Sequence, residues 1–169
     1  MKYRRFEELP VWKDAIELAV RTFALTANQC FRAHSRLRSQ LEAAAVSILN
    51  NIAEGFERGT TPDTLNFISI ARGSASEARS MYEFLRRTPG FEEVRSSLPD
   101  LIRRAESISR QLRAWADALQ NTDIRGQRYL TDRSRTREQR IKERNEFVKE
   151  LEQIQAQNIA RARNAGETA

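Results

Sequence analysis

Residues 98–120 read LPDLIRRAESISRQLRAWADALQ, and apolar side chains recur in this stretch at alternating steps of three and four. The apolar positions are Leu98, Leu101, Ala105, Ile108, Leu112, Trp115 and Leu119. A stripe with this heptad spacing is typical of a helix that packs along its length against other helices. The stretch therefore predicts a helix over 98–120 in a bundle core or a coiled-coil seam.

Three earlier segments have a similar periodicity and supply the partner helices. We expect helices over about 11–31, 35–56 and 62–87, with Gly55 and Gly59 at the end of the second and Thr61 as the N-cap of the third. The expected stripes are Trp12, Ile16, Ala19 and Phe23, then Leu41, Ala45, Ile48 and Ile52, then Ile68, Ala71, Ala75, Ala78, Tyr82 and Leu85. Short connections favour an all-α, antiparallel up-down-up-down four-helix bundle over residues 1–120.

The composition changes after residue 120. Residues 121–136 are polar and basic and predict a linker, whereas residues 137–169 predict an additional charged C-terminal helix with a disordered end. The apolar stripe of that helix is thin. Such a helix must lie on the bundle, pair with another chain or bind a polyanion.

Charge and composition restrict the class of protein. The 169 residues include 29 Lys and Arg against 23 Asp and Glu, a net charge of +6 that favours polyanionic partners. A mixed-charge helical surface accounts for the same figure. Cys30 is the only cysteine, which excludes an intrachain disulfide. No apolar run suits a signal peptide or a membrane span, so we expect a cytoplasmic protein with no membrane partner.

The basic signal is densest over residues 125–144, where eight basic side chains accompany three acidic ones. The candidate nucleic-acid-binding residues are Arg125, Arg128, Tyr129, Arg133, Arg135, Arg137, Arg140, Lys142 and Arg144. Arginine binds phosphate through two parallel hydrogen bonds, and a tyrosine can stack on a base. A plain exposed helix stabilised by pairs such as Glu138 with Lys142 explains the pattern equally.

Two polar sets lie inside the expected second and third helices. Ser47, Asn51 and Glu54 share one helix face, and Gly73, Ser74 and Glu77 share another. Buried polar groups need hydrogen-bonding partners. The two sets therefore predict a helix-packing or oligomer polar network, with a ligand or partner site as the alternative.

The residues that catalysis requires are scarce. His34 is the only histidine, and although Cys30 lies four residues before it, no third group is placed to orient such a pair. Arg72, Gly73 and Ser74 lie within an expected helix rather than in a phosphate-binding loop. We therefore expect a protein that is not an enzyme and that has no cofactor and no metal site.

Several stretches in this order resemble the bacterial four-helix-bundle proteins encoded in 23S rRNA intervening sequences. They are FEELPVWKDA (6–15), LRSQ (37–40), AA (43–44), SI (47–48), NIAEG (51–55), Phe67 and IARGSASE (70–77). The resemblance covers roughly residues 5–120. The connection over residues 28–36 departs from the family pattern by being more basic, and the segment after residue 121 is longer than the family core.

The resemblance implies an antiparallel four-helix bundle that assembles into a ring-shaped homopentamer. A related branch is the accessory variability determinant of diversity-generating retroelements, whose members bind nucleic acid and partner a reverse transcriptase. Charge and resemblance together favour a homo-oligomeric adaptor for structured RNA, for DNA, or for an RNA–reverse-transcriptase complex. The alternative is a protein–protein scaffold that uses its C-terminal helix and has no nucleic-acid role.

Overall fold

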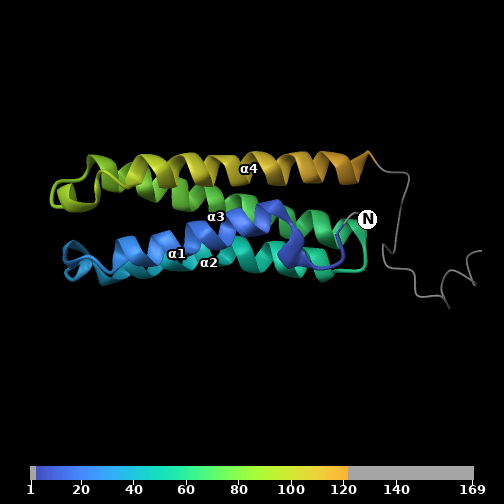
Figure 1. Ribbon diagram of the computed structural model, residues 1–169, viewed down its shortest axis with the longest axis horizontal. Coiled ribbons are helices and arrows are strands. Elements are labelled where there is room, and N and C mark those ends of the chain that lie inside the picture. Colours follow the sequence, from blue (N-terminus) through green and yellow to red (C-terminus); the bar gives the residue numbers. More distant parts are fainter. Residues whose placement is uncertain (1–2, 122–169) are drawn as a thin grey trace, which may run out of the picture. The chain divides into compact units, whose positions relative to one another are not determined.

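The structure is a computed structural model that describes residues 3–121. Its four α-helices are α1 (Pro10–Thr26), α2 (Ser35–Glu57), α3 (Thr61–Arg87) and α4 (Leu98–Gln120), and three short 3-10 helices lie at Phe6–Glu8, Gln29–Phe31 and Glu92–Val94. The prediction of an all-α four-helix bundle is confirmed (Figure 1). None of the helices within residues 3–121 combines the length and the apolar character needed to cross a membrane.

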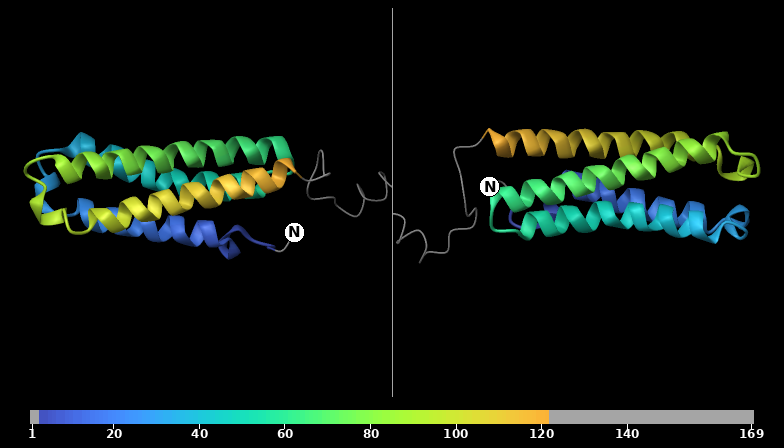
Figure 2. Two further views of the ribbon diagram at one scale, coloured as in Figure 1. Left: turned by 90° about the horizontal axis from the view of Figure 1, so that it is seen from above. Right: turned by 180° about the vertical axis from the view of Figure 1, so that it is seen from behind.

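Successive helices run in opposite directions, and the chain closes into a bundle because α1 packs against both α2 and α4 (Figures 1 and 2). The connections over residues 27–34 and 88–97 lie together at one end, which we call the loop end. The N-terminal residues, the connection over residues 58–60 and the end of α4 lie at the opposite end.

The ends of α3 follow from local side-chain chemistry. The side chain of Thr60 accepts a hydrogen bond from the backbone N–H of Asp63 at 3.3 Å. The N-cap is therefore Thr60. The sequence-based prediction of Thr61 is wrong, because Thr61 is already helical and buried. At the other end the helix stops before Pro89, and Gly90 turns the chain with a φ of 89° that glycine adopts without steric cost.

The apolar stripes predicted for α2, α3 and α4 form the core of the bundle. Every member of the three stripes is buried except Trp115, which is partly buried against the others. Each fully buried leucine or isoleucine contributes about 1.5–3 kcal/mol relative to exposure. The three stripes therefore supply most of the apolar surface that holds the bundle together.

The stripe predicted for α1 is only half right: Ala19 is buried and Trp12 packs partly buried against the core, but the other two members lie outside it. Ile16 is 38% exposed and Phe23 is 45% exposed. The face of α1 that meets the core is Val11, Ala15, Leu18, Thr22 and Leu25. The helix also ends at Thr26 rather than near residue 31, because Asn28 caps a separate 3-10 turn by accepting a hydrogen bond from the N–H of Cys30 at 3.0 Å.

Gly55 does not act as the helix cap that the sequence predicted. It lies buried inside α2, which continues to Glu57 and ends at Arg58 in extended geometry. A Cβ atom placed on Gly55 would lie 2.8 Å from the Cβ of Phe67 on α3, which is closer than Cβ atoms approach their neighbours in real proteins. The absence of a side chain at Gly55 is therefore what lets α2 and α3 approach each other here.

One buried hydrogen bond joins α1 to α3 through the interior of the bundle. The hydroxyl of Tyr82 lies 2.6 Å from the hydroxyl of Thr22, which in turn donates to the carbonyl of Leu18 at 2.7 Å. Both side chains are fully buried. Burial raises the pKa of Tyr82 to about 12.

Candidate functional site

The two predicted polar sets meet in part along the α2–α3 contact. The hydroxyls of Ser47 and Ser74 lie 2.8 Å apart. The amide of Asn51 donates to the carbonyl of Ser47 at 2.7 Å and to its hydroxyl at 3.0 Å, and Ser74 donates to the carbonyl of Ile70 at 3.2 Å. These contacts are part-buried and are satisfied within the chain, so the geometry here is that of helix packing.

The other three members of the polar sets lie outside this cluster. Glu54 is exposed and pairs with Arg58 one turn further along α2. Glu77 is exposed on α3. Gly73 is also exposed, and a Cβ atom placed on it would meet no atom within 4 Å, so it does not bring helices together as Gly55 does.

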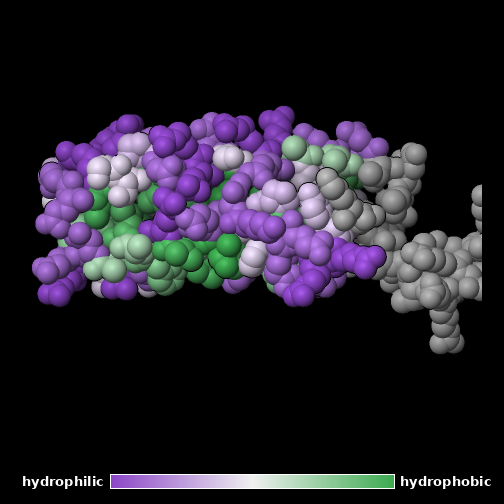
Figure 3. All heavy atoms as spheres, viewed as in Figure 1, coloured by the Kyte–Doolittle hydropathy of each residue, from purple (hydrophilic) through white to green (hydrophobic). Residues whose placement is uncertain are grey.

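The face of α1 that points away from the core is apolar. Ile16 is 38%, Val20 is 60% and Phe23 is 45% exposed, at the i, i+4 and i+7 spacing that places them on one side of the helix. Hydrophobic side chains gather over α1 in the left half of Figure 3, surrounded by polar surface. We call Ile16, Val20 and Phe23 the α1 outer face. An apolar patch with a polar rim is typical of a protein–protein contact surface.

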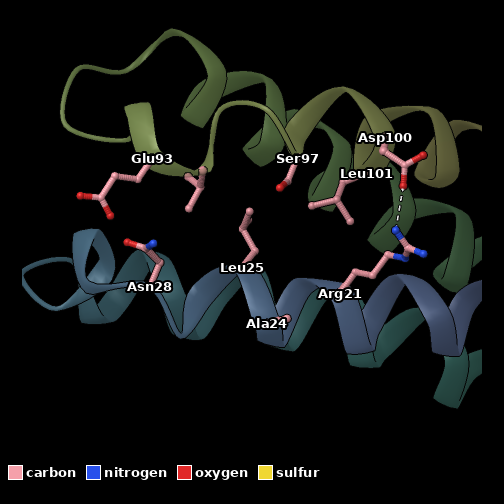
Figure 4. A pocket seen from close by; sticks show the side chains of 9 residues that line it. Arg21, Ala24, Leu25, Asn28, Glu93, Ser97, Asp100 and Leu101 are labelled. Atoms are coloured by element: carbon pink, nitrogen blue, oxygen red, sulfur yellow. Dashed lines mark hydrogen bonds and ion pairs between the residues drawn. The ribbon is translucent and has the colours of Figure 1, made fainter.

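A groove of about 430 Å³ separates α1 from α4 near the loop end (Figure 4). Arg21 spans it to reach Asp100 at 3.4 Å and also pairs with Glu17 at 2.6 Å. A hydrogen bond from Arg104 holds the pKa of Asp100 below its usual value. Glu93 adds a further carboxylate to the lining, and the net negative charge does not suit a phosphate group.

Most of the positive charge on the bundle is neutralised locally. Residues 3–121 contain 17 basic side chains, and eleven of them form ion pairs with carboxylates, mostly one helical turn away. The basic residues without an ion pair among the described residues are Arg4, Lys13, Arg32, Arg36, Arg72 and Arg79. Two of these, Arg32 and Arg36, lie together at the loop end.

A second pocket, of about 460 Å³, opens at the loop end between the start of α2 and the end of α3. We call it the loop-end pocket. Its lining includes His34, Arg36, Gln40, Phe84 and Phe91. None of these residues was predicted from the sequence as a binding residue, and His34 was considered only as half of a catalytic pair with Cys30. A signal was available in the more basic connection over residues 28–36, but nothing in the sequence showed that Phe84 would come beside it.

Cys30 and His34 do not share a helix face, because α1 ends before them and α2 begins after them. The ring of His34 packs against Phe91, with centroids 5.3 Å apart. Burial and the charge of Glu93 raise the pKa of the Cys30 thiol, the opposite of the shift that activates a cysteine nucleophile. Among residues 3–121, no group of three or more acidic, histidine or cysteine side chains is arranged to hold a metal ion.

The predicted nucleic-acid-binding residues between Arg125 and Arg144, together with the proposed linker and C-terminal helix, lie outside the described residues. Among the described residues, we take the α1 outer face and the loop-end pocket as the candidate contact surfaces.

A comparison with known protein families matches residues 7–114 to the family described as 23S rRNA-intervening sequence protein. The match covers more than half of the chain and includes the whole of α1, α2 and α3 and most of α4. No curated protein matches the sequence. The family match agrees with the resemblance drawn from the NIAEG and IARGSASE stretches over the same part of the chain.

Proposed function

This chain belongs to the 23S rRNA-intervening sequence protein family, and from that premise we propose that it is a non-enzymatic, homo-oligomeric adaptor that binds structured RNA, alone or in complex with a reverse transcriptase. The observation that carries the proposal is the α1 outer face. Three large apolar side chains on one exposed helix face lose contact with water when a second copy of the chain covers them.

The RNA part of the proposal is supported by the distribution of charge. The chain has a net charge of +6, and residues 125–144 alone contribute +5 from eight basic and three acidic side chains. An oligomer repeats this segment once per subunit. Several copies acting on one RNA bind more tightly than one copy, because each further contact forms at a high local concentration.

The first experiment measures assembly and nucleic acid together. The full chain, purified from its source cells, is passed over a size-exclusion column with light scattering at low and at high salt, and the absorbance ratio at 260 and 280 nm is recorded. We expect a defined oligomer that carries nucleic acid at low salt and releases it at high salt, because phosphate contacts weaken steeply with salt. A monomer at both salts would contradict the assembly part, and an oligomer without nucleic acid would contradict the RNA part.

Variants separate the two parts of the proposal. Val20→Asp places a charge in the α1 outer face and is expected to dissociate the oligomer. The matched control is Ile70→Asp, which makes the same kind of change at a side chain that is 44% exposed on α3. If Ile70→Asp dissociates the oligomer and Val20→Asp does not, the contact surface lies on α3 and not on α1.

A second pair of variants tests the RNA site. Replacing Arg133, Arg135, Arg137 and Arg140 by glutamine is expected to weaken RNA binding and to flatten its salt dependence. The control removes the same charge from α4 by replacing Arg103, Arg104, Arg110 and Arg113, which are already ion-paired. Equal losses in both variants would show a response to overall charge instead of a site between residues 133 and 140.

The second candidate function is a protein–protein scaffold without a nucleic-acid role. The observation that favours it is the extent of ion pairing on the bundle, which leaves few basic side chains free for phosphate. In that case Val148→Asp and Leu151→Asp, in the predicted C-terminal helix, abolish partner binding or assembly. RNA binding that survives in these variants while a protein partner is lost would support the scaffold.

A further inference from the structure

The loop-end pocket is lined by exposed aromatic rings and by one aromatic ring that is buried in the core. Phe84 on α3 is 55% exposed and lines the pocket, so its ring is accessible to a ligand. The buried ring of Phe91 closes the pocket from behind, with centroids 5.2 Å from Phe31 and 5.3 Å from His34. Phe91 is buried in the core, and the exposed ring of His34 packs on it. A flat aromatic ligand can therefore stack here without reorganising the chain.

Two arginines at this end of the bundle have no ion-pair partner among the described residues, although Glu92 and Glu93 also lie at the loop end. Arg36 lines the pocket, and Arg32 precedes it by four residues; neither forms an ion pair with any described carboxylate. This differs from the next arginine along α2, Arg38, which binds Glu42 at 2.8 Å. Guanidinium groups that have no carboxylate partner are free to bind phosphate.

Two polar side chains in the pocket lining can form hydrogen bonds with a ligand. Gln40 lines the wall with an amide that both donates and accepts, and Ser35 adds a hydroxyl. The volume of about 460 Å³ is sufficient for a base with its sugar, since ligand pockets of about 300–1,000 Å³ hold small molecules. The residues that line the pocket belong to the loop end, and both described chain ends lie at the opposite end of the bundle (Figure 1).

We propose that the loop-end pocket holds one unpaired nucleotide of an RNA, with its base against Phe84 and His34 and its phosphate on Arg36 and Arg32. The inference rests on the proposed RNA-binding function and adds a site within the bundle itself. It predicts that the chain prefers RNA with an exposed base, as in a loop, bulge or end, to a fully paired helix. Stacking tolerates any base, so the preference is for an unpaired state and not for a sequence.

The test uses the full chain and a short fluorescent single-stranded RNA, with fluorescence anisotropy as the readout. Phe84→Ala is expected to weaken binding between about fivefold and a hundredfold, the range for loss of one base-stacking contact. Phe84→Trp keeps an aromatic face and is expected to restore affinity. The matched control is Ile70→Ala, which removes another exposed apolar side chain from the same helix and is expected to leave affinity unchanged.

The salt dependence of binding and the affinity for duplex RNA test the phosphate contact and the need for an unpaired base. Arg36→Gln is expected to reduce the slope of log affinity against log salt by about 0.7, as for one phosphate contact to a single strand. A duplex of the same sequence is expected to bind equally well to the parent chain and to Phe84→Ala. Thermal melting of each variant checks the fold, and Phe84→Ala is expected to melt near the parent because its ring is more than half exposed.

The outcomes separate this inference from the proposed function. If the parent binds the RNA and Phe84→Ala binds it equally well, the pocket is not the site, and the RNA adaptor stands without it. If Phe84→Ala loses single-stranded and duplex RNA to the same extent, the pocket does not recognise an unpaired base. If the parent binds no RNA in either form, both proposals fail, and a pocket that then binds an apolar peptide would support the scaffold.

Discussion

Gly55 and Gly73 carry the same side chain, a single hydrogen, in opposite surroundings. Gly55→Ala forces a Cβ atom to within 2.8 Å of Phe67 across the α2–α3 contact, and we expect it to lower the free energy of unfolding by about 1–3 kcal/mol. Gly73→Ala meets open space in a helix and should raise it by about 0.5–1 kcal/mol. Urea unfolding of both variants measures the difference. A neutral Gly55→Ala would show that the two helices separate easily.

Tyr82 makes the stability of the bundle depend on pH in the alkaline range. Its pKa is about 12 in the fold and close to 10 in the unfolded chain. The unfolded chain therefore loses this proton first as the pH rises, and the free energy of unfolding falls above about pH 10 and levels off above about pH 12. Between about pH 9 and about pH 11.5 we expect Tyr82 to contribute a loss of about 2 kcal/mol.

The variant Tyr82→Phe isolates this effect from other groups that titrate at high pH. Its free energy of unfolding is expected to fall less than that of the parent over the same pH range, while Thr22 keeps its hydrogen bond to the carbonyl of Leu18. Urea unfolding at the two pH values gives the comparison, and absorbance at 295 nm follows the tyrosine itself. Identical pH dependence in the two proteins would mean that Tyr82 ionises freely.

For individual residues, the sequence predicted which polar side chains share a helix face better than it predicted which of them touch across the helices. It placed Ser47 and Ser74 in polar sets on two helices, and the structure brings them to 2.8 Å. It placed Glu54 and Glu77 in the same sets, yet both are exposed. Spacing along one helix shows which residues share a face. It does not show at which height the neighbouring helix crosses, and that height decides which side chains meet.

The contribution of an N-cap to the stability of a whole helix can be tested at the start of α3. Thr60→Ala removes the hydrogen bond that caps α3 and is expected to cost about 1 kcal/mol, whereas Thr60→Ser keeps it. Ser97 stands at the same position before α4 but its side chain makes no cap hydrogen bond, so Ser97→Ala is the matched control and should cost less than Thr60→Ala. Thermal melting reports both. Equal losses would mean that the cap of α3 contributes nothing beyond the shortened side chain.

Three of the four helices could be predicted to within a few residues because one apolar stripe dominates each of them. In α1, apolar side chains lie on two faces, and either face satisfies a helical period. The sequence favoured the stripe that includes Ile16 and Phe23, which the structure leaves largely exposed. That error has a physical origin, since the helical period alone does not show which of two apolar faces packs against the rest of the bundle.

For the molecule as a whole, assembly and stability should be linked. If copies of the chain associate only when folded, dilution favours unfolding, and the midpoint of thermal unfolding rises with protein concentration. Val20→Asp is expected to remove this dependence and to melt at a lower temperature than the parent at high concentration. Scanning calorimetry over a wide range of concentrations measures it. A midpoint that does not change with dilution in the parent would contradict assembly through α1.

Four antiparallel helices return the chain to the end of the bundle from which it started (Figure 1). The first described residues and Asn121 are therefore both found away from the loop end. In terms of modular architecture, the bundle is a unit whose two described chain ends lie on the same side. A fusion partner joined beside either of these ends would not have to cross the loop-end pocket.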